Sequence, residues 1–175
     1  LTRLAKQHFG LKDDPRLTII HQDARMYLNQ TDKEYDVILV DAFNSLSVLP
    51  YQITTREAVE RMSGILNERG VVMVNMISAL EGDRGLFTRA QYATYKQVFP
   101  QVFLLRVDPD KPPETVQNVM LVAVKSTAPV TFKNADPQLE GYLQNRVVQP
   151  VAQDVPVLTD DHAPVAYYMG KAMRP

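Results

Sequence analysis

Residues 35–50, YDVILVDAFNSLSVLP, begin as a buried strand and end in a polar loop that Pro50 closes. Side chains of a strand alternate between the two faces of its sheet, and the strand expected over residues 36–42 is mostly apolar on both faces. That pattern is typical of a parallel strand in the middle of a sheet. Asp41 lies at the tip of this strand and Asn44 follows three residues later, so this loop is the first candidate for a functional site.

Strand and helix patterns alternate along the rest of the chain, which predicts an α/β fold with a mainly parallel sheet. Thr54 or Thr55 should cap a helix that Gly70 ends. The last two strands should pair antiparallel. The expected strands are residues 16–23, 36–42, 71–78, 101–108 and 118–126, and the expected helices are residues 1–10, a short one within 24–35, 54–70, 85–100 and 137–148.

Length and composition indicate one ordinary globular domain. The chain has 175 residues, with 19 Lys and Arg against 20 Asp and Glu, and a formal net charge of −1. This balance gives no basic surface for nucleic acid or for a membrane, and no apolar run approaches the ~20 residues of a spanning helix. The absence of cysteine excludes disulfides and thiolate chemistry and fits a reducing compartment. We therefore expect a cytoplasmic protein with no nucleic-acid or membrane partner.

Parallel α/β sheets bind ligands beyond the carboxyl ends of their strands. Three segments should meet at that edge, because each follows an expected strand. They are Asp23–Ala24, the run from Asp41 to Asn44, and residues 75–78.

Four stretches together resemble a known family. They are LAKQHFGLKDDPRLTIIHQDARMYL (4–28), YDVILVDAF (35–43), LNERGVVMVNMIS (66–78) and VLTDDHAPVAYY (157–168). In this order they resemble the second half of the spermidine synthase (aminopropyltransferase) family, over most of residues 1–168. The resemblance implies the Rossmann-like fold of S-adenosylmethionine-dependent methyltransferases, with an antiparallel strand at the C-terminal end of the sheet.

The resemblance also implies a nucleoside site. Asp23 would accept a hydrogen bond from the adenine amino group, and the small side chain of Ala24 would let the ring approach. Asp41 and Ala42 would complete this part of the cofactor site. The alternative for Asp23 is an N-cap of the helix that starts at Ala24, and the two roles are compatible.

The implied catalytic loop departs from the family pattern. The family has Asp-Ser-x-Asp-Pro, whereas this chain has Asp41, Ala42, Phe43 and Asn44. An amine must lose a proton to act as a nucleophile, and Asn44 cannot accept one at neutral pH. Asp41 could still hold a substrate amine by charge, or it could simply cap the strand end. For Asn44, the simpler interpretation is a turn residue.

Other candidate residues follow. The resemblance places substrate contacts at Tyr51 and Gln52, although a loop anchored by one aromatic residue is the simpler interpretation. The run Asp160, Asp161 and His162 suggests a metal site, but adjacent residues rarely converge on one ion, so we expect no metal. Thr159 or Asp160 is expected to cap a turn.

The family's glycine-rich cofactor loop and ribose-binding acid do not occur in these 175 residues, and both would precede Leu1. We therefore expect a single, N-terminally incomplete domain that is inactive alone. Its first fold strands would be missing, which leaves the strand 36–42 with an unpaired edge. Either residues 16–22 cover that edge or a second chain does, and we expect a homodimer.

The expected function is transfer of an aminopropyl group from decarboxylated S-adenosylmethionine to an amine, in polyamine biosynthesis, with methylthioadenosine as product. One alternative is an S-adenosylmethionine-dependent methyltransferase that acts on another small molecule. The second is a non-catalytic nucleoside-binding or interaction domain.

Overall fold

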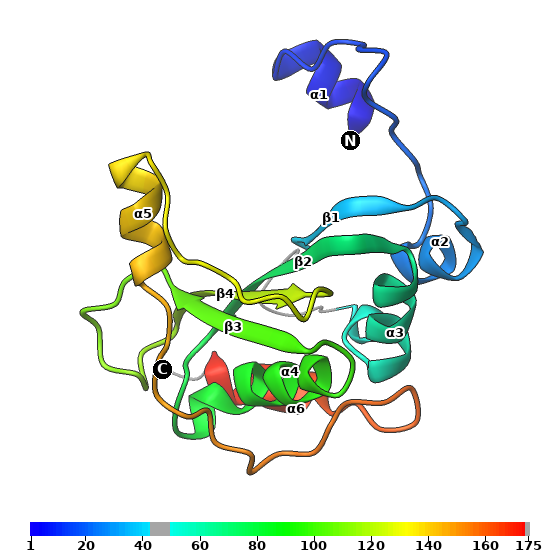
Figure 1. Ribbon diagram of the computed structural model, residues 1–175. Helices are drawn as coiled ribbons and strands as arrows, with labels where there is room; N and C mark the ends of the chain where they lie inside the picture. Colours follow the sequence, from blue (N-terminus) through cyan, green and yellow to red (C-terminus); the bar gives the residue numbers. More distant parts are fainter. Residues whose placement is uncertain (43–49, 174–175) are drawn as a thin grey trace.

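The computed structural model describes residues 1–42 and 50–173, and its centre is a four-stranded sheet of order β1-β2-β4-β3 (Figure 1). β1 pairs parallel with β2, whereas β4 pairs antiparallel with both β2 and β3. Three strands therefore run in one direction and β4 alone is reversed, which confirms the expected fold class. The strands are β1 (Tyr35–Val40), β2 (Leu66–Ser78), β3 (Gln101–Arg106) and β4 (Gln117–Val124).

Helices α3, α4 and α6 cover one face of this sheet, while α1 and α5 project away from it (Figure 1). The helices are α1 (Thr2–His8), α2 (Ala24–Gln30), α3 (Arg56–Gly64), α4 (Leu86–Lys96), α5 (Pro137–Gln144) and α6 (Val165–Ala172), with two 3-10 turns, η1 (Tyr51–Ile53) and η2 (Asp83–Gly85).

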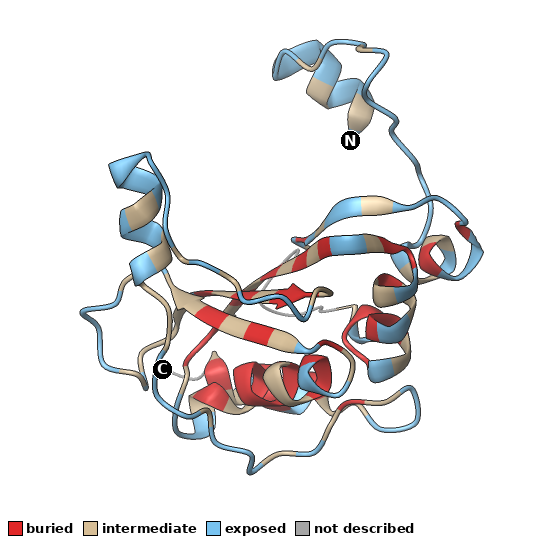
Figure 2. Ribbon diagram, viewed as in Figure 1, coloured by how far each residue is buried: buried red, intermediate tan, exposed pale blue. Residues whose placement is uncertain are grey.

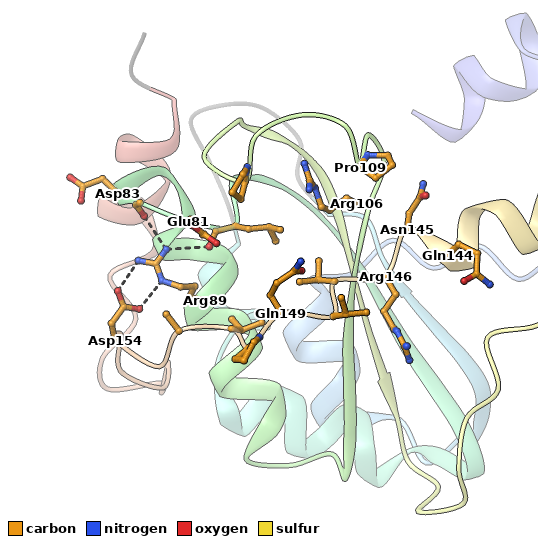
Figure 3. A pocket seen from close by; sticks show the side chains of 18 residues that line it. Glu81, Asp83, Arg89, Arg106, Pro109, Gln144, Asn145, Arg146, Gln149 and Asp154 are labelled. Carbon is orange, nitrogen blue, oxygen red and sulfur yellow. Dashed lines mark hydrogen bonds and ion pairs between the residues drawn. The ribbon is translucent and has the colours of Figure 1, made fainter.

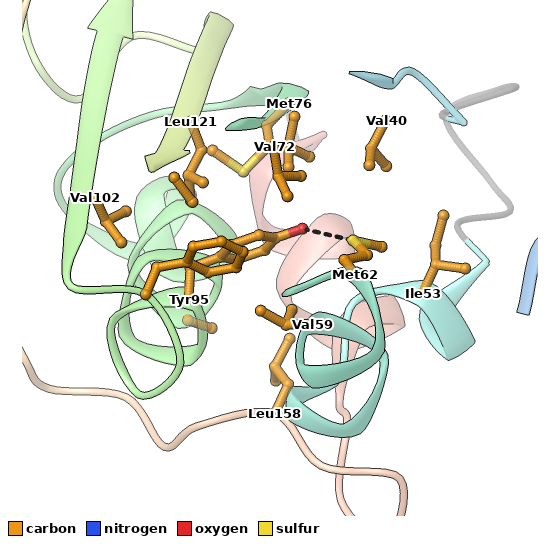
Figure 4. Close-up of a cluster of buried hydrophobic side chains, with 14 of the residues drawn as sticks. Val40, Ile53, Val59, Met62, Val72, Met76, Tyr95, Val102, Leu121 and Leu158 are labelled. Carbon is orange, nitrogen blue, oxygen red and sulfur yellow. Dashed lines mark hydrogen bonds between the residues drawn. The ribbon is translucent and has the colours of Figure 1, made fainter. Parts of the chain in front are cut away.

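The core lies between the sheet and these three helices (Figure 2). Along β2 buried and half-buried residues alternate, and Val72, Val74 and Met76 point into the core. Tyr95 of α4 is buried among them, and its hydroxyl donates to the sulfur of Met62 at 3.6 Å (Figure 4). Burial raises the pKa of Tyr95, because the interior disfavours the phenolate.

Most expected elements are confirmed, including the antiparallel pairing of β3 with β4, but three expectations are wrong. Residues 16–22 form no strand, and they pair with none of the strands in the described residues. The helix capped by Thr55 ends at Gly64 rather than Gly70, because β2 already begins at Leu66 in register with Tyr35. The last helix expected was that over residues 137–148, but the structure has a further helix, α6, after it.

β1 lies at the edge of the sheet. Within the described residues no strand pairs with its outer side, and Val37 and Leu39 are 51% and 71% exposed. Residues 16–22 were one of the two expected covers for this edge, and the structure shows that they do not pair with it. The other expected cover, a second chain, stays a prediction.

Candidate functional site

A groove of about 550 Å³ runs between β1 and the segment that leads into α2. Apolar residues such as Ile20 and Val37 form most of its wall, and Ala24, Asp41 and Ala42 line it together. The fold thus brings three of the predicted cofactor-binding residues to one groove at the carboxyl end of β1. The small side chains of Ala24 and Ala42 leave room for a flat ring, and the volume is within the ~300–1,000 Å³ of small-molecule sites.

An amide on the neighbouring strand binds the carboxylate of Asp41, and a second amide binds the first. The side-chain amide of Asn75 on β2 donates to Asp41 Oδ1 at 3.1 Å, and the amide of Asn118 on β4 donates to Asn75 Oδ1 at 2.9 Å. This relay crosses three strands at the edge where β1 and β2 end. Asp41 is exposed, so its carboxylate is held in place while it remains open to a ligand. The sequence signal for this relay was an asparagine within each of the apolar strands β2 and β4. The role of Asn118 was missed.

Asp23 is the N-cap of α2. Its side chain accepts from the backbone N–H of Met26 at 3.0 Å, which confirms the capping role. The residue is exposed and adjoins Ala24 at the rim of the groove. Its contact with a nucleoside stays a prediction, and capping leaves the carboxylate capacity for further hydrogen bonds.

The predicted substrate residues lie on η1. Tyr51 is half-exposed and Gln52 is exposed, while the backbone oxygen of Gln52 accepts from Arg25 at 2.8 Å. The fold therefore joins this turn directly to the first turn of α2. Asn44 lies outside the described residues.

The segment 157–163 makes contacts that sequence reasoning missed. Asp160 pairs with Arg25 at 2.6 Å and accepts from the hydroxyl of Thr55 at 2.6 Å. The expected turn is confirmed, since Thr159 Oγ1 accepts from the backbone N–H of His162 at 3.1 Å. Over residues 1–42 and 50–173, no three histidine or acidic side chains gather closely enough to hold a metal ion.

A second cavity, of about 670 Å³, lies beside η2 and contains none of the predicted site residues (Figure 3). Arg89 of α4 is buried there and binds Asp154 through two hydrogen bonds of 2.6 and 2.9 Å. The same guanidinium donates to the backbone oxygens of Leu80 and Gly82. This arginine ties the segment around Asp154 to the end of β2, which is a structural role.

The spermine/spermidine synthase domain family matches residues 2–134 of this chain. The chain belongs to the spermine/spermidine synthase family. Relatives in this family include the polyamine aminopropyltransferase 2 of Pseudomonas aeruginosa, 33% identical over 104 residues, which are 59% of this chain and 30% of that protein. A probable polyamine aminopropyl transferase of Bifidobacterium longum is 29% identical over 94% of this chain and 40% of its own length.

Solved structures of this spermine/spermidine synthase family share the fold. A probable spermidine synthase from Corynebacterium glutamicum has a TM-score of 0.63 at 23% identity, over 77% of this chain and 47% of its own. A spermidine synthase in complex with the transition-state analogue AdoDATO has a TM-score of 0.59 at 19% identity, over 99% of this chain and 54% of its own. Human methyltransferase-like protein 13 with SAH has a TM-score of 0.57 at 23% identity, over 82% of this chain and 64% of its own, which confirms the methyltransferase-type fold.

This chain of the spermine/spermidine synthase family spans only part of the length of its relatives. It spans 30% and 40% of the two aminopropyltransferases named above and about half of the solved spermidine synthases. Within the part that the structure describes, none of the helices has the length and apolar character needed to cross a membrane.

Proposed function

We propose that the protein containing this chain transfers an aminopropyl group from decarboxylated S-adenosylmethionine to an amine. The observation that carries the proposal is Asp41, exposed in a groove at the carboxyl end of β1 and held by Asn75, in a chain of the spermine/spermidine synthase family. The family match favours aminopropyl transfer over methyl transfer to another small molecule and over a binding-only role.

The proposed reaction is an in-line displacement at carbon. The lone pair of the amine nitrogen forms a bond to the aminopropyl carbon next to the sulfonium, and the carbon–sulfur bond breaks. The bond electrons stay on sulfur, which leaves neutral methylthioadenosine, and the alkylated nitrogen releases one proton to solvent water. Catalysis of this kind depends mainly on holding nucleophile and carbon in line, and such positioning contributes up to roughly 7–11 kcal/mol.

Each candidate residue has a role in this proposal. Asp41 accepts hydrogen bonds from the attacking amine and stabilises the positive charge that develops on its nitrogen. Asp23 and Ala24 bind the adenine ring, and Ala42 allows the donor to approach the carboxylate. Tyr51 and Gln52 bind the remainder of the amine. Asn44, which lies outside the described residues, is given no part in proton transfer, because an amide is not a base at neutral pH.

The proposal also covers assembly and location. For the 175-residue chain itself, no strand of the described residues pairs with the outer edge of β1, which supports pairing with a second copy as a homodimer. A cytoplasmic location is proposed because a chain without cysteine fits a reducing compartment. No metal takes part in the proposed reaction.

The test is a product assay with the complete protein. It is incubated with decarboxylated S-adenosylmethionine and, in turn, a set of linear diamines and triamines, and methylthioadenosine is measured by mass spectrometry. We expect methylthioadenosine and the aminopropylated amine in equal amounts, and neither without the amine. Methyl transfer from S-adenosylmethionine, with no aminopropyl product from any amine, would overturn the proposal.

A further inference from the structure

The structure joins three distant parts of the chain through one guanidinium. Arg25 lies in the first turn of α2, next to Ala24, and its side chain is only 17% exposed. It donates to the carboxylate of Asp160 at 2.6 Å, to the backbone oxygen of Gln52 at 2.8 Å and to the hydroxyl of Thr55 at 3.1 Å. A planar fork of five N–H donors suits such a three-way contact, which a lysine could not reproduce.

Asp160, the acidic partner of Arg25, makes three hydrogen bonds of its own. One of its carboxylate oxygens accepts from Arg25, the other accepts from the fully buried Thr55, and its backbone N–H donates to Glu57 at 2.9 Å. Burial raises the pKa of Glu57, but the hydrogen bonds that its carboxylate accepts, including that from the backbone N–H of Asp160, outweigh this and hold the pKa below its usual value. Asp160 is the one carboxylate that pairs with Arg25 within the described residues, and a mostly buried guanidinium needs such a partner.

The hydrogen bonds of Arg25 and Asp160 lie between the predicted nucleoside contacts and the predicted amine contacts. On one side Arg25 adjoins Asp23 and Ala24, which are the predicted nucleoside contacts. On the other side it holds the backbone of Gln52, and η1 presents the predicted amine contacts. The spacing between the two halves is therefore set by Arg25, and the orientation of Arg25 is set by Asp160.

We propose that Asp160, acting through Arg25, is a positioning residue that fixes the nucleoside-binding start of α2 relative to the amine-binding turn η1. The ligand part of this inference rests on the proposed function. Asp160 touches neither ligand, so its loss should weaken binding of both and leave the chemical step of bound molecules almost unchanged.

The first test uses hydrogen–deuterium exchange of this chain and needs no ligand. Asp160→Asn keeps the size of the side chain but removes the charge that Arg25 pairs with. We expect amide exchange to rise about tenfold or more over residues 23–30 and 51–55, with β2 and β4 unchanged. Asp161→Asn is the matched control, because it removes a neighbouring exposed acid whose side chain makes no hydrogen bond to any of the described residues, and it should leave all regions unchanged.

The second test uses steady-state kinetics of the complete protein. Asp160→Asn should raise the KM for the nucleoside donor and for the amine about tenfold each, with kcat per folded molecule within about threefold of the parent. Asp160→Glu, which restores the charge, should recover part of the loss. Arg25→Lys keeps the ion pair but loses the bonds to Gln52 and Thr55, so it should weaken amine binding more than donor binding.

Two results would overturn the positioning role. The first is unchanged exchange over residues 23–30 and 51–55 in Asp160→Asn. The second is a uniform rise in exchange across the whole sheet, which would mean that Asp160 contributes global stability only. A parent protein that makes no methylthioadenosine would instead count against the proposed function, and the exchange experiment would still decide the role of Asp160.

Discussion

At the scale of single residues, Asp41 is the residue on which the proposed chemistry depends. Asn75 and Asn118 hold its carboxylate without burying it, so its removal should cost little stability. We predict that Asp41→Asn in the complete protein lowers turnover by about 100-fold or more while the free energy of unfolding changes by about 1 kcal/mol.

A matched control for this substitution lies at the other end of the same strand. Asp36 is also exposed and also accepts from an asparagine, Asn67, at 2.7 Å, but it lies at the start of β1 and does not line the groove. Asp36→Asn should change stability by a similar amount and leave turnover unchanged. Equal turnover in Asp41→Asn and its parent would end the catalytic role of Asp41.

A second prediction at the residue scale compares substitutions at Gly85 and Gly64. A β-carbon on Gly85 would lie 2.5 Å from the backbone carbonyl carbon of Leu80, whereas one on Gly64 would meet nothing within 4 Å. We predict that Gly85→Ala destabilises the fold by about 1–3 kcal/mol and that Gly64→Ala stays within about 1 kcal/mol of the parent, on the stabilising side. Urea unfolding followed by circular dichroism measures both, and equal midpoints would contradict the close packing of η2 against Leu80.

At the scale of elements, the Arg89–Asp154 ion pair joins the segment that precedes Thr159 to the turn that begins η2. Hydrogen bonds from Arg89 hold the pKa of the Asp154 carboxyl below its ordinary value of 3.8. A group whose pKa is lowered by folding contributes stability above its unfolded pKa, and that contribution disappears as pH falls through the folded pKa. The pair should therefore stabilise the fold at neutral pH and be lost below about pH 4.

Asp154→Asn tests this sign directly. At pH 7 we expect a loss of about 1 kcal/mol, at the lower end for such pairs because the Asp154 side chain is 53% exposed. The difference in unfolding midpoint between parent and variant should shrink as the pH is lowered from 5 to about 3. A constant difference across this range would show that the charge of Asp154 does not stabilise the fold.

At the scale of the whole molecule, the proposed homodimer depends on the outer edge of β1, with which no strand of the described residues pairs. Its unpaired backbone and the exposed side chains of Val37 and Leu39 form a surface on which another strand can add. We predict that the purified chain is a dimer by light scattering at micromolar concentrations, and that Leu39→Lys makes it a monomer. Leu139→Lys on α5, where the parent leucine is 48% exposed, is the control and should remain dimeric. A parent chain that is monomeric at all concentrations would rule out the homodimer.

The sequence by itself determined the local elements and their order. The start of α2 at Asp23 and of α3 at Thr55 was predictable because a cap depends on hydrogen bonds within three residues. The buried stripe of β2 was predictable because alternation is fixed by backbone geometry. The same local patterns placed Asp41 at a strand end, and the order of motifs gave the family.

Only the tertiary structure decided what depends on partners far along the chain. Residues 16–22 have strand-like composition but form no strand, because composition alone does not make a strand and they pair with no other strand of the described residues. Leu66 joins β2 rather than the preceding helix because Tyr35 of β1 pairs with it. Arg25 and Asp160 are 135 residues apart, so no local pattern could reveal that they meet. The sequence thus places the candidate acid, whereas the contacts that orient the residues around it arise only when the chain folds.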